Sequence, residues 1–236
     1  MNADGKNIEI DGICIDVVRK NIRNIHLRVR PPLGTVTVSA PLRMDIVKIR
    51  EFCTSKITWI KKHHEKMKAL KLEPAKEYVS GEEHLYLGKR YVIDVIEGNA
   101  RRKVVFSNEA IHIYVNRGEG KKKRKELLEK WYKARLKELV LPHISRLESV
   151  MNVKVEKLTI RTMKSRWGTC NYREKKICLN TELAKKHFES IEYVLIHELA
   201  HLLERGHQKE FKTVMDKFSP AWRRLRKELK SRRTED

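Results

Sequence analysis

A five-residue stretch, His197-Glu198-Leu199-Ala200-His201, most constrains how this chain can fold. Apolar residues recur around it at three- and four-residue spacing, which predicts a buried helix over residues 190–205 with Ser190 as its N-cap. Residues four apart on a helix lie about 40° apart around its axis, so His197 and His201 project from one face. Two imidazoles placed in this way can bind one metal ion.

The residues beside and after these histidines complete the predicted site. Glu198 projects at a different angle, which suits a general base that acts on water rather than a ligand. A catalytic zinc ion usually has three protein ligands and one open position. We expect His207 to be the third ligand, because Gly206 can end the helix in a left-handed conformation and turn the chain back. Rival third ligands are the carboxylates of Glu204, Glu210 and Asp216. The sequence therefore predicts a hydrolase with one Zn²⁺ ion.

A loop and a strand before this helix could line the substrate cleft. Residues 164–169 join two expected strands and include Arg166 and Trp167. Arg166 could stabilise an oxyanion or bind a carboxylate or phosphate, or it could only tie the loop down. The strand over 176–180, which ends at Asn180, could be a sheet edge that binds an extended peptide, or an ordinary core strand. Arg166, Trp167 and Asn180 are the candidate substrate-binding residues.

The order of expected elements predicts an α+β protein with two domains. Residues 1–120 are expected to form a β-rich domain, with a small antiparallel sheet over 8–40, one long helix over about 45–70, and short strands with hairpin connections over 83–115. The basic run Lys121–Lys125 follows two glycines and marks the expected boundary. Residues 121–236 are expected to form a helical, zincin-like catalytic domain with a small sheet, beginning with a long helix that Pro142 kinks or breaks.

Composition limits the partners and the compartment. Lys and Arg outnumber Asp and Glu by 53 to 31, and the formal net charge of +22 predicts attraction to polyanions such as nucleic acid. The four cysteines form no CxxC pair, which is typical of reduced thiols and a cytoplasmic protein. We expect no membrane association, because the sequence has neither an apolar leader nor a run of about 18–20 apolar residues.

Several motifs together resemble a known family over nearly the whole chain. They are Val38-Ser39-Ala40-Pro41, Trp59-Ile60, Tyr86-Leu87-Gly88-Lys89-Arg90-Tyr91, Arg166-Trp167-Gly168-Thr169-Cys170, Leu179-Asn180 and the stretch from Tyr193 to Leu202. With these residues the sequence resembles the YgjP-like metallopeptidase family of bacterial and archaeal metal-dependent hydrolases, which is related more distantly to SprT-like and WLM-type proteases.

The resemblance implies zinc bound by His197, His201 and His207, with Glu198 as the catalytic acid and base. The sequence departs from the family after the third histidine, where Gln208 and Phe211-Lys212 replace the usual Ser and Phe-Trp. Glu204 stands where the metzincin pattern has glycine, which argues against that clan.

Three functions compete for this sequence. The first is a metallopeptidase with a peptide or protein substrate. The second is a nucleoside triphosphate pyrophosphohydrolase that uses the same metal site, for which the positive charge and Arg166 would be useful. The third is a nucleic-acid-associated protease or binding protein, whose affinity would fall steeply with salt. The metallopeptidase is the leading hypothesis.

Overall fold

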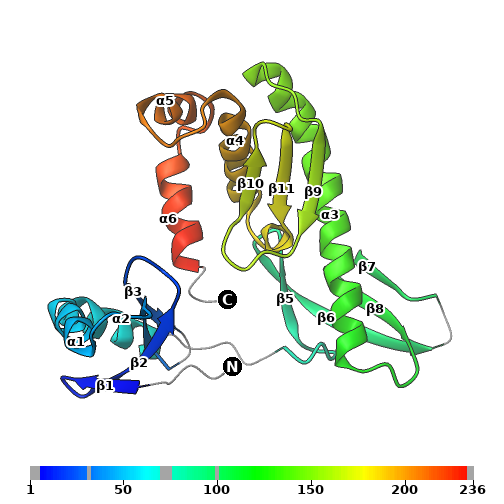
Figure 1. The fold of residues 1–236 in the computed structure, drawn as a ribbon. Helices are drawn as coiled ribbons and strands as arrows, with labels where there is room; N and C mark the ends of the chain where they lie inside the picture. The colour runs from blue at the N-terminus through cyan, green and yellow to red at the C-terminus, as the bar shows by residue number, and fades with distance from the viewer. Residues whose placement is uncertain (1–5, 31–32, 70–75, 99–100, 233–236) are drawn as a thin grey trace. The chain divides into compact units, whose positions relative to one another are not determined.

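The computed structural model describes residues 6–30, 33–69, 76–98 and 101–232 (Figure 1). They form an α+β protein, as the sequence predicts. The chain divides into two compact units, Met1–Pro74 with Lys230–Asp236, and Ala75–Leu229. The boundary expected near residue 120 lies inside the second unit, because the strands before it and the helix after it share one buried apolar cluster. The change in composition there marks the start of a helix.

The first unit contains a four-stranded mixed sheet. Its strands are β1 (Lys6–Ile10), β2 (Ile13–Lys20), β3 (His26–Arg30) and β4 (Thr35–Pro41), in the order β1-β2-β4-β3. The outer pairs are antiparallel as predicted, but β2 and β4 are parallel. The parallel pair places Ile15 beside Val36 and Val17 beside Val38, and all four side chains are buried. The prediction of a purely antiparallel sheet is therefore wrong for the central pair.

Two helices, α1 (Ile46–Ser55) and α2 (Ile57–Ala69), take the place of the single helix expected over 45–70. Asp45 caps α1 by accepting the backbone N–H of Val47. The first helix ends at Ser55, whose hydroxyl donates to the carbonyl of Phe52 over 2.8 Å. Such local bonds compete with the helical pattern. Lys56 ends α1 before the chain resumes as α2.

The second unit begins with a sheet of the same topology. Its strands are β5 (Glu83–Tyr86), β6 (Lys89–Gly98), β7 (Lys103–Ser107) and β8 (Ala110–Asn116), in the order β5-β6-β8-β7. Two hairpins, β5-β6 and β7-β8, meet through the parallel pair β6-β8. The hairpin connection expected between β6 and β7 is therefore not formed. Both four-stranded sheets join two hairpins through a parallel central pair.

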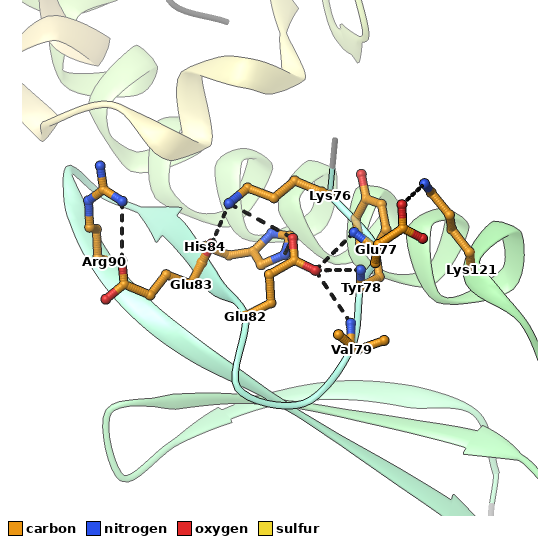
Figure 2. Close-up of polar contacts among 9 residues, drawn as sticks. All are labelled: Lys76, Glu77, Tyr78, Val79, Glu82, Glu83, His84, Arg90 and Lys121. Atoms are coloured by element: carbon orange, nitrogen blue, oxygen red, sulfur yellow. Dashed lines mark hydrogen bonds and ion pairs between the residues drawn. The ribbon is translucent and has the colours of Figure 1, made fainter. Parts of the chain in front are cut away.

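A carboxylate fixes the segment that leads into β5 (Figure 2). Glu82 Oε2 accepts the backbone N–H groups of residues 77–79 at 3.0, 2.6 and 3.4 Å. Its other oxygen lies 3.3 Å from Nε2 of the buried His84. An ion pair of 2.6 Å between Glu77 and Lys121 connects this segment to the helix that follows the sheet. Burial is the main cause that lowers the pKa of His84, although the carboxylate of Glu82 opposes it.

The long helix α3 (Lys121–Met151) connects this sheet to the rest of the unit. It continues through Pro142 without ending, so the break considered from the sequence does not occur. Its buried side, which includes Leu128, Leu136 and Ile144, contacts β7 and β8 near one end and β9 further along (Figure 1). One apolar core therefore spans both sheets of the second unit.

A three-stranded sheet and three helices complete the unit. The strands β9 (Lys157–Arg161), β10 (Gly168–Asn171) and β11 (Lys176–Asn180) lie in the order β10-β11-β9. A short 3-10 helix, η1 (Thr181–Lys185), precedes α4 (Phe188–Leu203), α5 (Lys209–Phe218) and α6 (Trp222–Arg232). Helix α4 contacts β10 and α3 (Figure 1). Among the described residues, no helix is both long and apolar enough to cross a membrane.

Candidate metal centre

Helix α4 carries the histidines that the sequence places on one helical face. It begins at Phe188 with His187 as its N-cap, earlier than the start expected at Ser190, and Glu189 lies in its first turn. An acidic side chain there interacts favourably with the positive end of the helix dipole. Apolar residues bury most of the helix, which fixes its orientation in the core. The two histidines are therefore held by a rigid element.

Three histidine side chains converge at the end of this helix. The candidate ligand atoms of His197, His201 and His207 all lie within 4.8 Å of one another. Nε2 of His197 lies 3.4 Å from Nε2 of His207. At Zn–N distances of about 2.0–2.1 Å, two nitrogen ligands of a tetrahedral ion lie about 3.3–3.4 Å apart. These residues therefore fit a zinc ion.

The rival carboxylate ligands do not join this group. Within the described residues, the group of three or more His, Cys, Asp or Glu side chains whose spacing suits a metal ion consists of the three histidines and contains no carboxylate. The carbonyl of Glu204 accepts from Nδ1 of His201 over 3.2 Å, which orients that ring and leaves its Nε2 for a metal. Asp216 is hydrogen-bonded to Trp222 and Arg223.

His207 reaches the other histidines by a route that the sequence did not predict. The helix ends at Leu203, and Glu204 has an extended backbone with φ of −133° and ψ of 118°. Gly206 is not among the glycines with positive φ, so the left-handed turn expected there is wrong. The extended Glu204 makes the change of direction. Its N–H still donates to the carbonyl of Ala200 over 2.8 Å.

Phe211 packs against the three histidines, although in the sequence it stood out only within a departure from the family pattern. Its buried ring lies 5.1 Å from the ring of His197, 4.7 Å from His201 and 4.8 Å from His207, measured between centroids. An aromatic ring against three imidazoles restricts their rotation. The only sequence signal for this role is the position of Phe211, four residues after His207 on the next amphipathic helix.

Glu198 lies in a buried environment next to a glycine. Its side chain is 5% exposed, and burial raises its pKa to about 7, with the positive charge of Arg166 acting in the opposite direction. A Cβ atom on Gly168 would lie 2.6 Å from Oε1 of Glu198, so the missing side chain makes room for the carboxylate. A group with a pKa near 7 can both accept and donate a proton at neutral pH.

Burial also keeps His197 and His201 neutral. The pKa of His197 falls to about 3, mainly by burial and then by the neighbouring His201 and His207. Burial is likewise the main cause that lowers the pKa of His201. A neutral imidazole has the free lone pair that a metal ion requires.

The loop before β10 is held by Asn180 at the end of β11. Nδ2 of Asn180 donates to the carbonyls of Met163 and Arg166, each over 2.8 Å. Its Oδ1 accepts the backbone N–H groups of Met163 and Glu182, each over 3.2 Å. The side-chain amide, proposed from sequence to contact substrate, is thus fully used inside the protein. Arg166, which precedes Trp167 in the same loop, lies close enough to Glu198 for its positive charge to lower the pKa of that carboxyl group.

The three-stranded sheet offers an edge beside the metal centre. Strand β11, considered from the sequence as an edge, is the central strand, because β10 and β9 pair with its two sides. Strand β10 is at the edge and contacts α4. It begins at Gly168, against which the side chain of Glu198 lies in space. The candidate base and an edge strand therefore adjoin each other.

Comparisons with known proteins give matches to metallopeptidases. The sequence model of the YgjP-like metallopeptidase domain matches residues 23–232. The crystal structure of the metallopeptidase zymogen abylysin of Pyrococcus abyssi is similar with a TM-score of 0.35 and 20% identity, covering 37% of this chain and 89% of that one. The zymogen jannalysin of Methanocaldococcus jannaschii gives 0.34 and 16%, covering 37% and 90%. No curated protein matches the sequence.

Proposed function

Because the chain belongs to the YgjP-like metallopeptidase family, we propose that it is a zinc-dependent peptidase whose single ion is held by His197, His201 and His207. The observation that carries this proposal is the convergence of three imidazoles at a spacing that suits tetrahedral zinc. The hydrogen bond from His201 to the carbonyl of Glu204 supports it, because zinc-bound histidines usually donate their second N–H in this way.

Glu198 is the proposed general base and acid. When bound, the zinc ion supplies a Lewis acid that lowers the pKa of water and polarises a carbonyl group. Glu198 takes a proton from the attacking water and gives it to the amine that leaves. Its pKa of about 7 suits both steps. Arg166 limits the rise of this pKa and so keeps part of the carboxyl population ionised at neutral pH.

The edge strand β10 is the proposed binding site for the substrate backbone. An extended peptide can add to a sheet edge through main-chain hydrogen bonds, which depend little on side chains. This placement would hold the peptide next to Gly168, where Glu198 approaches the strand. We therefore expect weak sequence preference close to the bond that is cut.

The test compares Glu198→Gln with Glu189→Gln. Both variants replace a carboxylate of α4 by an amide, but Glu189 lies in the first turn and is exposed. We expect zinc to bind in both variants, and hydrolysis of casein to fall about 10²–10⁴-fold only in Glu198→Gln. Equal casein hydrolysis in the wild-type and Glu198→Gln proteins would refute the assigned role.

The same samples test the two other functions. Hydrolysis of nucleoside triphosphates that depends on zinc and Glu198, without hydrolysis of casein, would favour the pyrophosphohydrolase. Binding of DNA with a steep dependence on salt would support a nucleic-acid partner. Part of the basic charge of α6 is already neutralised, since Arg223 pairs with Asp216, and Arg224 with Glu189 and Glu228.

A further inference from the structure

The segment between α4 and α5 carries His207, the most exposed of the three histidines. Backbone hydrogen bonds hold both ends of this segment, from Glu204 to the carbonyl of Ala200 and from Lys212 to the carbonyl of Gln208. His207 itself lies between these ends in a stretch without helix or strand. Side-chain contacts must therefore contribute to its position.

One such contact reaches across to the three-stranded sheet. The guanidinium carbon of Arg205 lies 4.3 Å from the centre of the Tyr172 ring, a distance typical of a cation–π contact. Tyr172 lies in the turn that joins the edge strand β10 to β11. The turn thus contacts the segment two residues before the third histidine.

Hydrogen bonds fix the turn that carries Tyr172. Asn171 Oδ1 accepts the backbone N–H groups of Arg173 and Glu174, each over 3.2 Å. The carbonyl of Lys175 accepts the N–H of Glu156 over 2.9 Å. The hydroxyl of Tyr172 accepts from Nε of Arg173 over 3.2 Å. These bonds hold the turn independently of the segment that carries His207.

We propose that Tyr172 and Arg205 are positioning residues that hold His207 in place for the metal ion, and we call this pair the Tyr172–Arg205 clasp. The inference rests on the proposed zinc site. A ligand held in place before the metal arrives loses less conformational freedom on binding, so the clasp increases metal affinity. It also connects the edge strand proposed for substrate to one of the metal ligands.

The direction in which zinc affinity changes when Arg205 is replaced distinguishes the clasp from a simple electrostatic effect of its charge. Arg205 places a positive charge two residues from a proposed zinc ligand, and like charges repel. Removal of that charge alone would tighten zinc binding. The clasp predicts the opposite, because the loss of the contact releases His207.

The test measures zinc affinity by competition with a chromophoric chelator. We expect Arg205→Ala and Tyr172→Ala each to weaken zinc binding about two- to five-fold, the range that corresponds to an exposed cation–π contact. The double variant should bind no more weakly than either single variant, because both remove the same contact. Tyr172→Phe keeps the ring and should restore affinity close to wild type.

Arg173→Ala is the matched control. This variant removes one positive charge from the turn that carries Tyr172. The side chain of Arg173 contacts Tyr172 itself, and within the described part of the chain it makes no contact with the segment that carries His207. We expect unchanged zinc affinity for this variant, because the bonds made by Asn171 Oδ1 and by the carbonyl of Lys175 still hold the turn. The melting temperatures of all zinc-free variants should stay close to wild type, which would exclude a general loss of folding.

The outcomes distinguish this inference from the proposed function. Wild-type protein that binds zinc, with unchanged or tighter binding in Arg205→Ala, would overturn the clasp alone. Additive losses in the double variant, or equal losses in Tyr172→Phe and Tyr172→Ala, would also overturn it. Wild-type protein without affinity for zinc would overturn the metal site itself and the clasp with it.

Discussion

Replacement of Gly168 by alanine gives a sharp test of how the site is built. An added Cβ would lie 2.6 Å from Oε1, 2.7 Å from Cγ and 2.9 Å from Cδ of Glu198. Ordinary contacts begin near 3.4 Å. The carboxylate would therefore have to move by roughly 0.8 Å, and a displacement of about 1 Å costs about 100-fold in rate. We expect kcat/KM for casein or a peptide to fall by about this factor.

The zinc content should not change in Gly168→Ala, because the atoms nearest to an added Cβ all belong to Glu198, which is not a proposed ligand. Gly168 does not have a positive φ, so alanine imposes no backbone strain. The remaining clash lowers the free energy of unfolding by about 1–3 kcal/mol. Urea denaturation and measurement of bound metal separate these effects from the loss of activity.

Gly206→Ala is the control for this prediction. It is the same substitution next to the proposed ligand His207, but the nearest atom to an added Cβ is Cγ of Gln208 at 3.6 Å, an ordinary contact. We expect its activity to stay within about two-fold of wild type, since no strain or clash arises. Full activity in Gly168→Ala, or equal losses in both variants, would refute the reasoning.

Three other predictions concern stability. Asn180→Ala should lower the free energy of unfolding by about 2–4 kcal/mol in urea denaturation, because it leaves buried carbonyl and N–H groups without partners; a loss under 1 kcal/mol would contradict this role. Because the pKa of His84 is lowered in the folded protein, the folded state binds fewer protons than the unfolded state, and the free energy of unfolding should fall as the pH drops below about 6.5. This fall should be smaller in His84→Gln. Identical slopes of unfolding free energy against pH in the two proteins would exclude His84 as the cause. Removal of metal with EDTA should lower the melting temperature. Zinc added at about 1,000 times the Kd of the wild-type protein should raise its free energy of unfolding by about 4 kcal/mol, and should raise that of His207→Ala by less. An equal rise in both proteins would argue against His207 as a ligand.

The sequence predicted the parts of the site that depend on local geometry. His197 and His201 share a face because the period of a helix fixes the angle between residues four apart. The amphipathic pattern around them predicted the helix, within a few residues of its start. The choice of His207 over the three carboxylates agrees with the convergence of the three rings.

Other features depend on contacts between distant residues. The parallel pairs β2-β4 and β6-β8 join strands from separate hairpins, and alternation along one strand does not specify the direction of its partner. Helix α3 continues through Pro142 because tertiary packing along its length offsets the local cost of proline. The Tyr172–Arg205 contact likewise joins residues far apart in the chain.

The sequence by itself therefore determined the residues on which the proposed chemistry rests, because the identity and spacing of His197, Glu198 and His201 are local properties of one helix. Only the tertiary structure decided how that chemistry is controlled. It buried Glu198 against Gly168, used the amide of Asn180 to hold the Arg166 loop, and turned the chain at Glu204. The physical reason is that burial and long-range hydrogen bonds depend on which segments pack together, and these segments are distant in the sequence.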